Sequence, residues 1–453
     1  MTQQGVRWTA DQVLALAPDS TSRKAGSKLG AAGPWSGTGS SPEGAVWGLC
    51  EGGGGGEGAS YRTVVDTAGG AGPAYECSCP SRKSPCKHAL GLLLLWSGGE
   101  GAPPAGRAPD WAERWLAGRG RTTEERAAGR AGSASGPADP EGARRRAERR
   151  AERITAGATE LEERLADLLR SGLATAERSG HGLWEETAAR MVDAQAPGLA
   201  ARVRELGSVP ASGPGWPARL LEECALLHLL DRGWLHRERL PDGLAATVRA
   251  RVGLPSSPVG PPVRDHWLVL AQYDTPDEKL TTRRIWLYGT ESGRTALLLS
   301  YGAAGRAPEL TLPVGLALDA ELTAHAGAGQ RRASLGEQFA PPAPTDTRPA
   351  GVTTTEAAAR YGEALVHDPW QESVPVTLAA VVPTPAGDSW QLADAEGDTA
   401  LPFTPAAASR PGLWRLVALS GGAPVRVFGE CGHRGFTPLT AWPAGEGAAV
   451  RLC

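Results

Sequence analysis

Three of the seven cysteines and one of the eight histidines lie close together between residues 77 and 88. Cys77, Cys79, Cys86 and His88 follow the spacing C-x-C-x6-C-x-H. Three thiols and one imidazole are a donor set that tetrahedral Zn²⁺ prefers in structural sites, where protein ligands fill all four positions and leave none for water. The cluster therefore predicts one structural zinc ion, and it constrains the fold of the surrounding chain to bring these four side chains together.

The spacing within each pair is compatible with a shared site. Cys77 and Cys79 are two residues apart on a predicted strand, so both thiols point to the same face. Two residues inside a helix differ by about 200° in direction, so Cys86 and His88 converge only at a helix start. A helix predicted over residues 87–96 places Cys86 there. Its N-terminal N–H groups would help to hold the Cys86 sulfur as a thiolate.

Three alternatives to a metal site stay open at this point. A Cys77–Cys79 disulfide would be strained and would not suit a reducing compartment. Cys86 and His88 could act as nucleophile and base, although such partners usually stand far apart in sequence and need a third group to orient them. The thiols could also be unrelated core residues, because free cysteines often pack as small apolar groups.

The segment from Tyr75 to Leu90 resembles the SWIM-type zinc finger family, and in particular its bacterial members, including actinobacterial ones. It reads Tyr-x-Cys-Ser-Cys-Pro-Ser-Arg-Lys-x-Pro-Cys-Lys-His-Ala-Leu. The resemblance implies that the three cysteines and His88 are the zinc ligands. It also implies binding of DNA or of other proteins. Bacterial relatives of similar length occur in genomic company with MoxR-type AAA+ ATPases and von Willebrand-type metal-ion-adhesion proteins, so a MoxR-type ATPase system is a candidate partner.

The first block of the chain carries most of its lysines. Arg82, Lys83 and Lys87 are candidate nucleic-acid contacts, and four of the five lysines fall within residues 1–97. These cations could equally offset the −1 charge that three thiolates and Zn²⁺ leave. Residues 1–96 hold 8 basic and 7 acidic side chains, and the whole chain has a net charge of −3, which argues against coating nucleic acid by bulk charge. The first hypothesis is therefore a protein-binding finger, and DNA binding through the basic loop is the alternative.

The rest of the chain predicts an α+β multidomain protein. Its expected parts are a β-hairpin and helix zinc finger block (1–97), a Gly/Pro/Arg-rich linker with a short helix starting near Asp110 (98–140), a helical region (141–255), and a mainly antiparallel β domain with an internal loop (262–453, loop 327–356). Thr9 with Gln12 forms a capping-box pattern for an early helix. The glycine run at 52–56 predicts an extended hairpin loop, since no Gly-Lys-Ser/Thr follows it.

Hydrophobic periodicity sets the expected elements. Apolar residues at spacings of three and four between Ala143 and Leu168 predict one long amphipathic helix. Further helices are expected over 183–196, 217–230 and 241–252. Short runs rich in Val, Leu and Trp predict strands over 45–47, 61–65, 74–79, 266–273, 284–288, 295–301, 374–382, 389–392, 414–419 and 425–428.

Other residues carry weaker signals. Cys431, His433 and Cys453 provide only three ligands for a second metal, so they are interpreted as ordinary side chains, and Cys224 with His228 as helix core. No Walker loop, nucleophile elbow, H-E-x-x-H or dinucleotide fingerprint occurs, so no catalytic residues are assigned and the protein is expected not to be an enzyme. A cryptic enzyme within residues 262–453 is the second alternative.

The terminal and apolar segments bear on location. The N-terminal residues lack the pattern of a signal peptide. The longest apolar run, at 90–96, is far shorter than the roughly 20 residues that span a bilayer. We expect a cytoplasmic protein without a membrane partner, and the preference for Arg, Ala and Gly is typical of a GC-rich bacterial genome.

Overall fold

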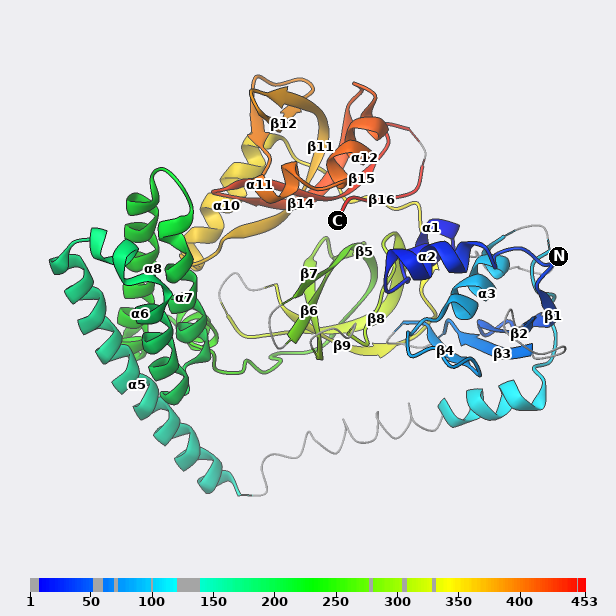
Figure 1. Ribbon diagram of the computed structural model, residues 1–453, viewed down its shortest axis with the longest axis horizontal. Coiled ribbons are helices and arrows are strands. Elements are labelled where there is room, and N and C mark those ends of the chain that lie inside the picture. Colours follow the sequence, from blue (N-terminus) through cyan, green and yellow to red (C-terminus); the bar gives the residue numbers. More distant parts are fainter. Residues whose placement is uncertain are drawn as a thin grey trace.

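The computed structural model describes residues 8–51, 60–68, 72–98, 101–119, 139–276, 280–303, 308–327, 331–445 and 447–453. A helical bundle lies at one end, the zinc finger block at the other, and two β-sheets lie between them (Figure 1). The predicted α+β class, with N-terminal strands and helix, central helices and C-terminal antiparallel sheets, is confirmed. The predicted glycine-run loop and about half of the predicted linker fall outside the described residues.

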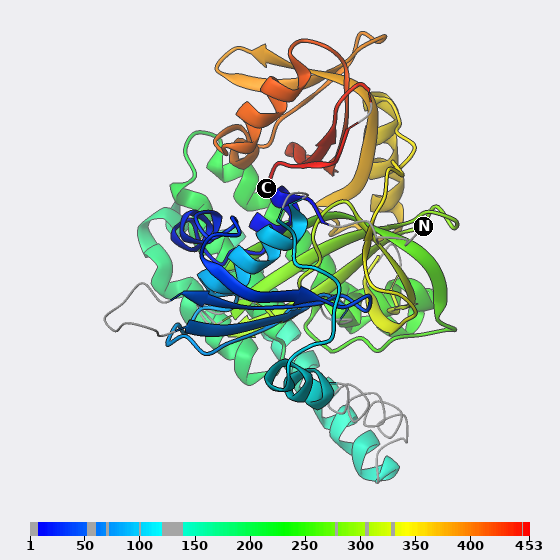
Figure 2. The ribbon, with the colours of Figure 1, turned by 90° about the vertical axis from the view of Figure 1, so that its right-hand side faces the viewer.

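The finger block is a four-stranded antiparallel sheet between two helical layers (Figure 2). Its elements are α1 (Ala10–Leu14), α2 (Ser20–Ser27), β1 (Trp35–Ser40), β2 (Ala45–Glu51), β3 (Ser60–Asp66), β4 (Ala74–Cys77), α3 (Lys87–Ser97) and a helix over residues 110–119. The predicted capping box of Thr9 and Gln12 is present. Val46 and Val65 face the core with α3, while Trp47 and Val64 face the helix over 110–119. The short helix predicted near Asp110 is thus present and packs on the sheet.

Five helices form the bundle. They are α5 (Pro140–Ser171), α6 (Ala174–Asp193), α7 (Pro197–Ser208), α8 (Trp216–Leu235) and α9 (Asp242–Arg251), with short 3₁₀ turns η1 (Val209–Ala211) and η2 (Arg237–Arg239). The predicted stripe of α5 is buried from Ile154 to Leu168. The prediction missed α7. The chain turns at Gln195, whose φ is 59°, and α7 begins at Pro197, a residue well suited to the first position of a helix.

Two antiparallel sheets follow the bundle. The first contains β5 (Val263–Pro276), β6 (Leu280–Gly289), β7 (Thr295–Ala303), β8 (Leu316–Ala324), β9 (Ala333–Gln338) and β10 (Ala343–Pro344), in the order β10-β8-β5-β6-β7 with β9 beside β8. The second contains β11 (Ser373–Ala386), β12 (Ser389–Asp394), β13 (Ala400–Pro402), β14 (Val425–Gly432), β15 (Gly435–Trp442) and β16 (Val450–Arg451), in the order β13-β12-β11-β14-β15-β16. Helices α10 (Thr354–His367), α11 (Pro405–Ala408) and α12 (Gly412–Ser420) accompany it. The two sheets share a core that includes Leu268, Trp286, Phe428 and Trp442.

Two local predictions differ from the structure. The strand predicted over 414–419 is wrong, because these residues form α12, with Leu413, Leu416 and Ser420 buried at helical spacing and Gly421 ending the helix in the left-handed region. The segment 327–356, predicted as a loop, contains β9, β10 and the start of α10. Thr353 and Glu356 form a capping box at that helix start.

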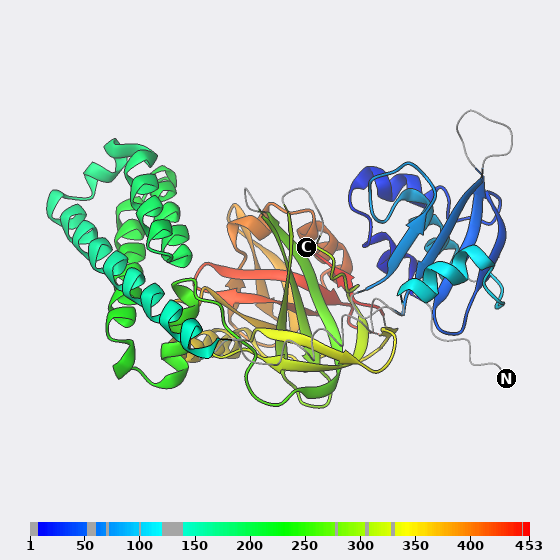
Figure 3. The ribbon, with the colours of Figure 1, turned by 90° about the horizontal axis from the view of Figure 1, so that it is seen from below.

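The bundle, the β-sheets and the finger block lie side by side in that order (Figure 3), and long-range contacts join them. Trp370, just before β11, is buried in the bundle core and its indole N–H donates to the Leu226 carbonyl at 2.8 Å. Asp368 is fully buried and pairs with Arg251 of α9 at 2.5 Å. At the other end, the Trp8 indole N–H donates to the Pro342 carbonyl at 3.4 Å, and Leu316 of β8 lies in the finger core. The finger and the bundle therefore both pack against the β-sheets.

Asp231 in α8 is expected to make stability depend on pH. It is fully buried, and neither carboxylate oxygen has a hydrogen-bond partner among the described residues. Burial, and secondarily the charge of Glu162, raise its pKa to about 9. The folded protein thus keeps a proton that the unfolded chain releases, so this group lowers the free energy of unfolding as pH rises from about 4 to about 9.

The Asp231→Asn variant tests this effect. It removes the titration, so its free energy of unfolding at pH 8 should exceed that of the wild type by several kcal/mol, at about 1.4 kcal/mol for each pH unit above the pKa of the unfolded chain, with little difference at pH 4. Urea unfolding followed by circular dichroism across this pH range measures both values. An equal effect at both pH values would show that Asp231 is not protonated in the fold.

Candidate metal centre

Four ligand atoms converge where β4 passes into α3. Cys77 is the last residue of β4, Cys79 follows in the loop, Cys86 is the N-cap of α3 and His88 lies in its first turn. Their three sulfur atoms and one imidazole nitrogen all lie within 4.8 Å of one another. The structure thus brings all four sequence-predicted ligands together, with Cys86 at the helix start as the spacing required.

The helix start prepares one sulfur for metal binding. The backbone N–H of Ala89 donates to the Cys86 sulfur at 3.5 Å. Contact with the Cys77 thiol, and more weakly this N–H, lower the pKa of Cys86 below its ordinary value against the opposing effect of burial. The same contact and burial raise the pKa of Cys77 to about 11. Zinc binds thiolates, so it would replace the proton that these two sulfurs compete for.

Two side chains of strand β3 contact the metal ligands. Thr63 stands directly opposite Cys77 in the β3–β4 register, and its hydroxyl lies 3.2 Å from the Cys77 sulfur. The Tyr61 ring lies against the His88 imidazole, with centroids 4.8 Å apart. Such outer contacts orient metal ligands. Neither residue belongs to the predicted ligand motif, although their i, i+2 spacing on a predicted strand places them on one face.

The donor set fits a structural zinc ion. Cys86 and His88 are buried and Cys77 and Cys79 are half-buried, which limits access of solvent to the centre. Three sulfurs and one nitrogen fill a tetrahedral shell without an open position, so the metal would hold the fold and supply no Lewis-acid chemistry.

The three candidate contact residues lie on the exposed side of the finger. Arg82, Lys83 and Lys87 are exposed, but only two of them line a groove of about 480 Å³ beside the metal centre. Lys83 also pairs with Asp19 at 2.8 Å. The hydrogen bond from Lys83, and next the N–H of Ser22, lower the pKa of Asp19 to about 2. The loop is thereby tied to the start of α2.

The remaining candidate ligands are dispersed. Cys431 is buried in the core of the second sheet, the Cys453 thiol donates to the Gln272 carbonyl, and His433 contacts Tyr361. Within the described ranges these three do not form a ligand group. Cys224 is core, as predicted. His228 is not core, because it is exposed and pairs with Glu162 at 2.7 Å.

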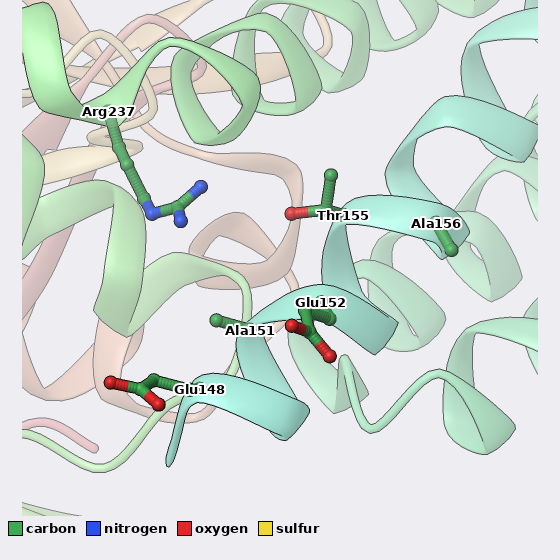
Figure 4. A pocket seen from close by; sticks show the side chains of 6 residues that line it. All are labelled: Glu148, Ala151, Glu152, Thr155, Ala156 and Arg237. Atoms are coloured by element: carbon green, nitrogen blue, oxygen red, sulfur yellow. The ribbon is translucent and has the colours of Figure 1, made fainter. Parts of the chain in front are cut away.

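A second groove, of about 460 Å³, lies on the bundle (Figure 4). Glu148, Glu152 and Thr155 of α5 line it together with Arg237 of η2 and two alanines. Arg237 also stacks on Trp234, with its guanidinium carbon 4.5 Å from the ring centroid. This groove and the one beside the finger both lie outside residues 262–453, where the cryptic-enzyme alternative placed its site.

A strand end and a helix start that together supply three thiols and one imidazole define a structural zinc finger. Residues 61–96 match the family model of the SWIM zinc finger, and residues 149–252 match that of the SWIM-associated four-helix bundle domain. The chain therefore contains a SWIM zinc finger followed by a SWIM-associated four-helix bundle. The comparisons with curated proteins and with solved structures gave no significant match.

The family models confirm that the finger resembles the SWIM-type zinc finger family, and they add a match for the bundle. The second match spans most of α5 and all of α6–α9.

Every helix in the described part of the chain is too short or too polar to cross a lipid bilayer.

Proposed function

We propose that this protein is an interaction protein whose zinc finger presents a binding surface to a protein partner. The observation that carries the proposal is that the finger separates its metal-binding side chains from its exposed charged loop. Its four metal-binding side chains point inward and leave no open coordination position, while the loop between them exposes cations beside a groove. A closed metal site of this kind can stabilise the conformation of the surface around it. The role that it supports best is therefore the binding of a partner to that surface.

The bundle and the two sheets extend this role. Both pack through buried contacts onto their neighbours, so they can hold the finger in a fixed position relative to further docking surfaces. The resemblance of the finger to bacterial SWIM proteins supports a MoxR-type ATPase system as the partner.

DNA binding is the second candidate, and the exposure of Arg82, Lys83 and Lys87 on one loop favours it. Against it, residues 1–96 hold 8 basic and 7 acidic side chains. Beyond these three cations the block therefore offers little excess positive charge to the many phosphates of a nucleic acid. We therefore place the protein partner first and regard catalysis as no part of the function.

Affinity purification of the intact protein from its own cells, with and without nuclease, tests this proposal. We expect protein partners to be retained after nuclease treatment, with a MoxR-type ATPase among them. Loss of every partner on nuclease treatment would favour nucleic-acid binding instead. Recovery of partners without the ATPase would contradict only the choice of partner.

A further inference from the structure

The groove beside the metal centre has three distinct sides. Thr21, Ser22 and Ala25 of α2 form one wall, and the finger loop with Lys83 and the helix start with Lys87 form the other. The paired rings of Tyr61 and His88 also line it. The groove is thus built by segments far apart in sequence.

The lining carries cations beside the metal centre. Its described residues include two lysines and no carboxylate, and the hydroxyls of Thr21, Ser22 and Ser81 add hydrogen-bond donors. Lysine ammonium groups and hydroxyls can both donate to carboxylate oxygens. A volume of about 480 Å³ admits a few side chains of a peptide.

A carboxylate of the chain itself already binds at the edge of this groove. Asp19 accepts from Lys83 at 2.8 Å and also caps α2 by accepting from the N–H of Ser22. The side chains of Lys83 and Asp19 are 52% and 39% exposed, so solvent screens this pair. Exposed pairs of this kind contribute little, and another carboxylate can therefore compete for Lys83.

We propose that the groove receives an acidic segment of the protein partner, whose Glu or Asp side chains bind Lys83 and Lys87 in competition with Asp19. This inference rests on the proposed function and specifies the chemistry of the partner. The two lysines call for an anionic ligand, and the carboxylate already bound at Lys83 together with the small volume of the groove favours an acidic peptide over a nucleic acid. Asp19 then acts as an internal competitor that weakens binding to less acidic segments.

Fluorescence anisotropy with the full-length zinc-loaded protein at low salt tests the groove. The probes are a fluorescein-labelled glutamate-rich octapeptide, the same peptide with glutamine in place of glutamate, and an oligothymidine of similar length. We expect the glutamate peptide to bind and the other two to bind at least about fivefold more weakly. Tighter binding of the oligothymidine would overturn the proposal in favour of nucleic acid.

Two double variants with the same change in charge locate the contact. Lys83→Gln with Lys87→Gln should weaken glutamate-peptide binding about five- to tenfold. Lys24→Gln with Lys28→Gln alters exposed lysines outside the groove lining and should change it less than twofold. Equal losses of affinity in the two variants would show that the peptide binds by general charge attraction and would contradict binding in the groove. The zinc content of each variant verifies that the finger is folded.

Asp19→Asn gives a change in the opposite direction. Asparagine keeps the N-cap of α2 but removes the charge that competes for Lys83, so glutamate-peptide affinity should rise about two- to threefold. An unchanged or reduced affinity would contradict competition at this site. If the Lys83/Lys87 variant still retains nuclease-resistant partners from cells, the groove is wrong while the proposed interaction function stands.

Discussion

Replacing Cys79 by alanine is expected to abolish zinc binding and to unfold the finger block. A structural zinc ion contributes on the order of 10 kcal/mol to the folding of a small finger, because the unfolded chain has no preformed site. The core of this block includes Cys86 and Leu90 on α3, so loss of the metal removes the link between the helix start and β4. Zinc analysis together with limited proteolysis of residues 8–98 measures both effects.

Cys453→Ala is the matched control for this variant. Its thiol is not one of the four grouped ligands and donates to the Gln272 carbonyl, so the variant should keep full zinc content and a protease-resistant finger block. If Cys79→Ala also kept both, the assignment of the zinc ligands would be wrong.

Trp370→Ala is expected to produce the second largest effect. The side chain is 3% exposed and packs in the bundle core, although Trp370 lies outside the sequence of the bundle. Its indole N–H donates to the Leu226 carbonyl. Removing a buried tryptophan costs about 3–5 kcal/mol through lost burial and the cavity that remains. Chemical unfolding should therefore show that the bundle unfolds at a lower denaturant concentration, in a transition separate from that of the second sheet.

Trp414→Ala provides the comparison, since Trp414 is 64% exposed on α12. Its replacement should change the free energy of unfolding by less than about 1 kcal/mol. Similar losses in the two variants would contradict the account in which Trp370 joins the bundle to the β-sheets.

The sequence predicted those features that depend on local spacing. The four zinc ligands lie within a short segment, so their spacing on a strand and at a helix start was sufficient to find them. The capping box at Thr9 and the stripe from Ile154 to Leu168 were likewise local signals, and both are confirmed.

Features that depend on tertiary packing were missed or misassigned. The apolar run at 414–419 fits a strand or a helix by composition, and its helical burial is decided by packing on the second sheet. The strand β8 was also missed, although Leu316, Leu318 and Leu322 recur with a period of two along Leu316–Ala324, a pattern typical of a strand with one buried face. Trp370 and Asp368 gave no signal, because their partners on α8 and α9 lie more than a hundred residues away.

The coordination of the metal tests the central claim most directly. Zinc analysis of the purified full-length protein, combined with X-ray absorption at the zinc edge, gives both the amount of metal and the identity of its ligands. The account predicts one zinc ion per chain, bound by three sulfur atoms and one nitrogen atom. Absence of zinc, or a shell dominated by oxygen and nitrogen, would contradict it.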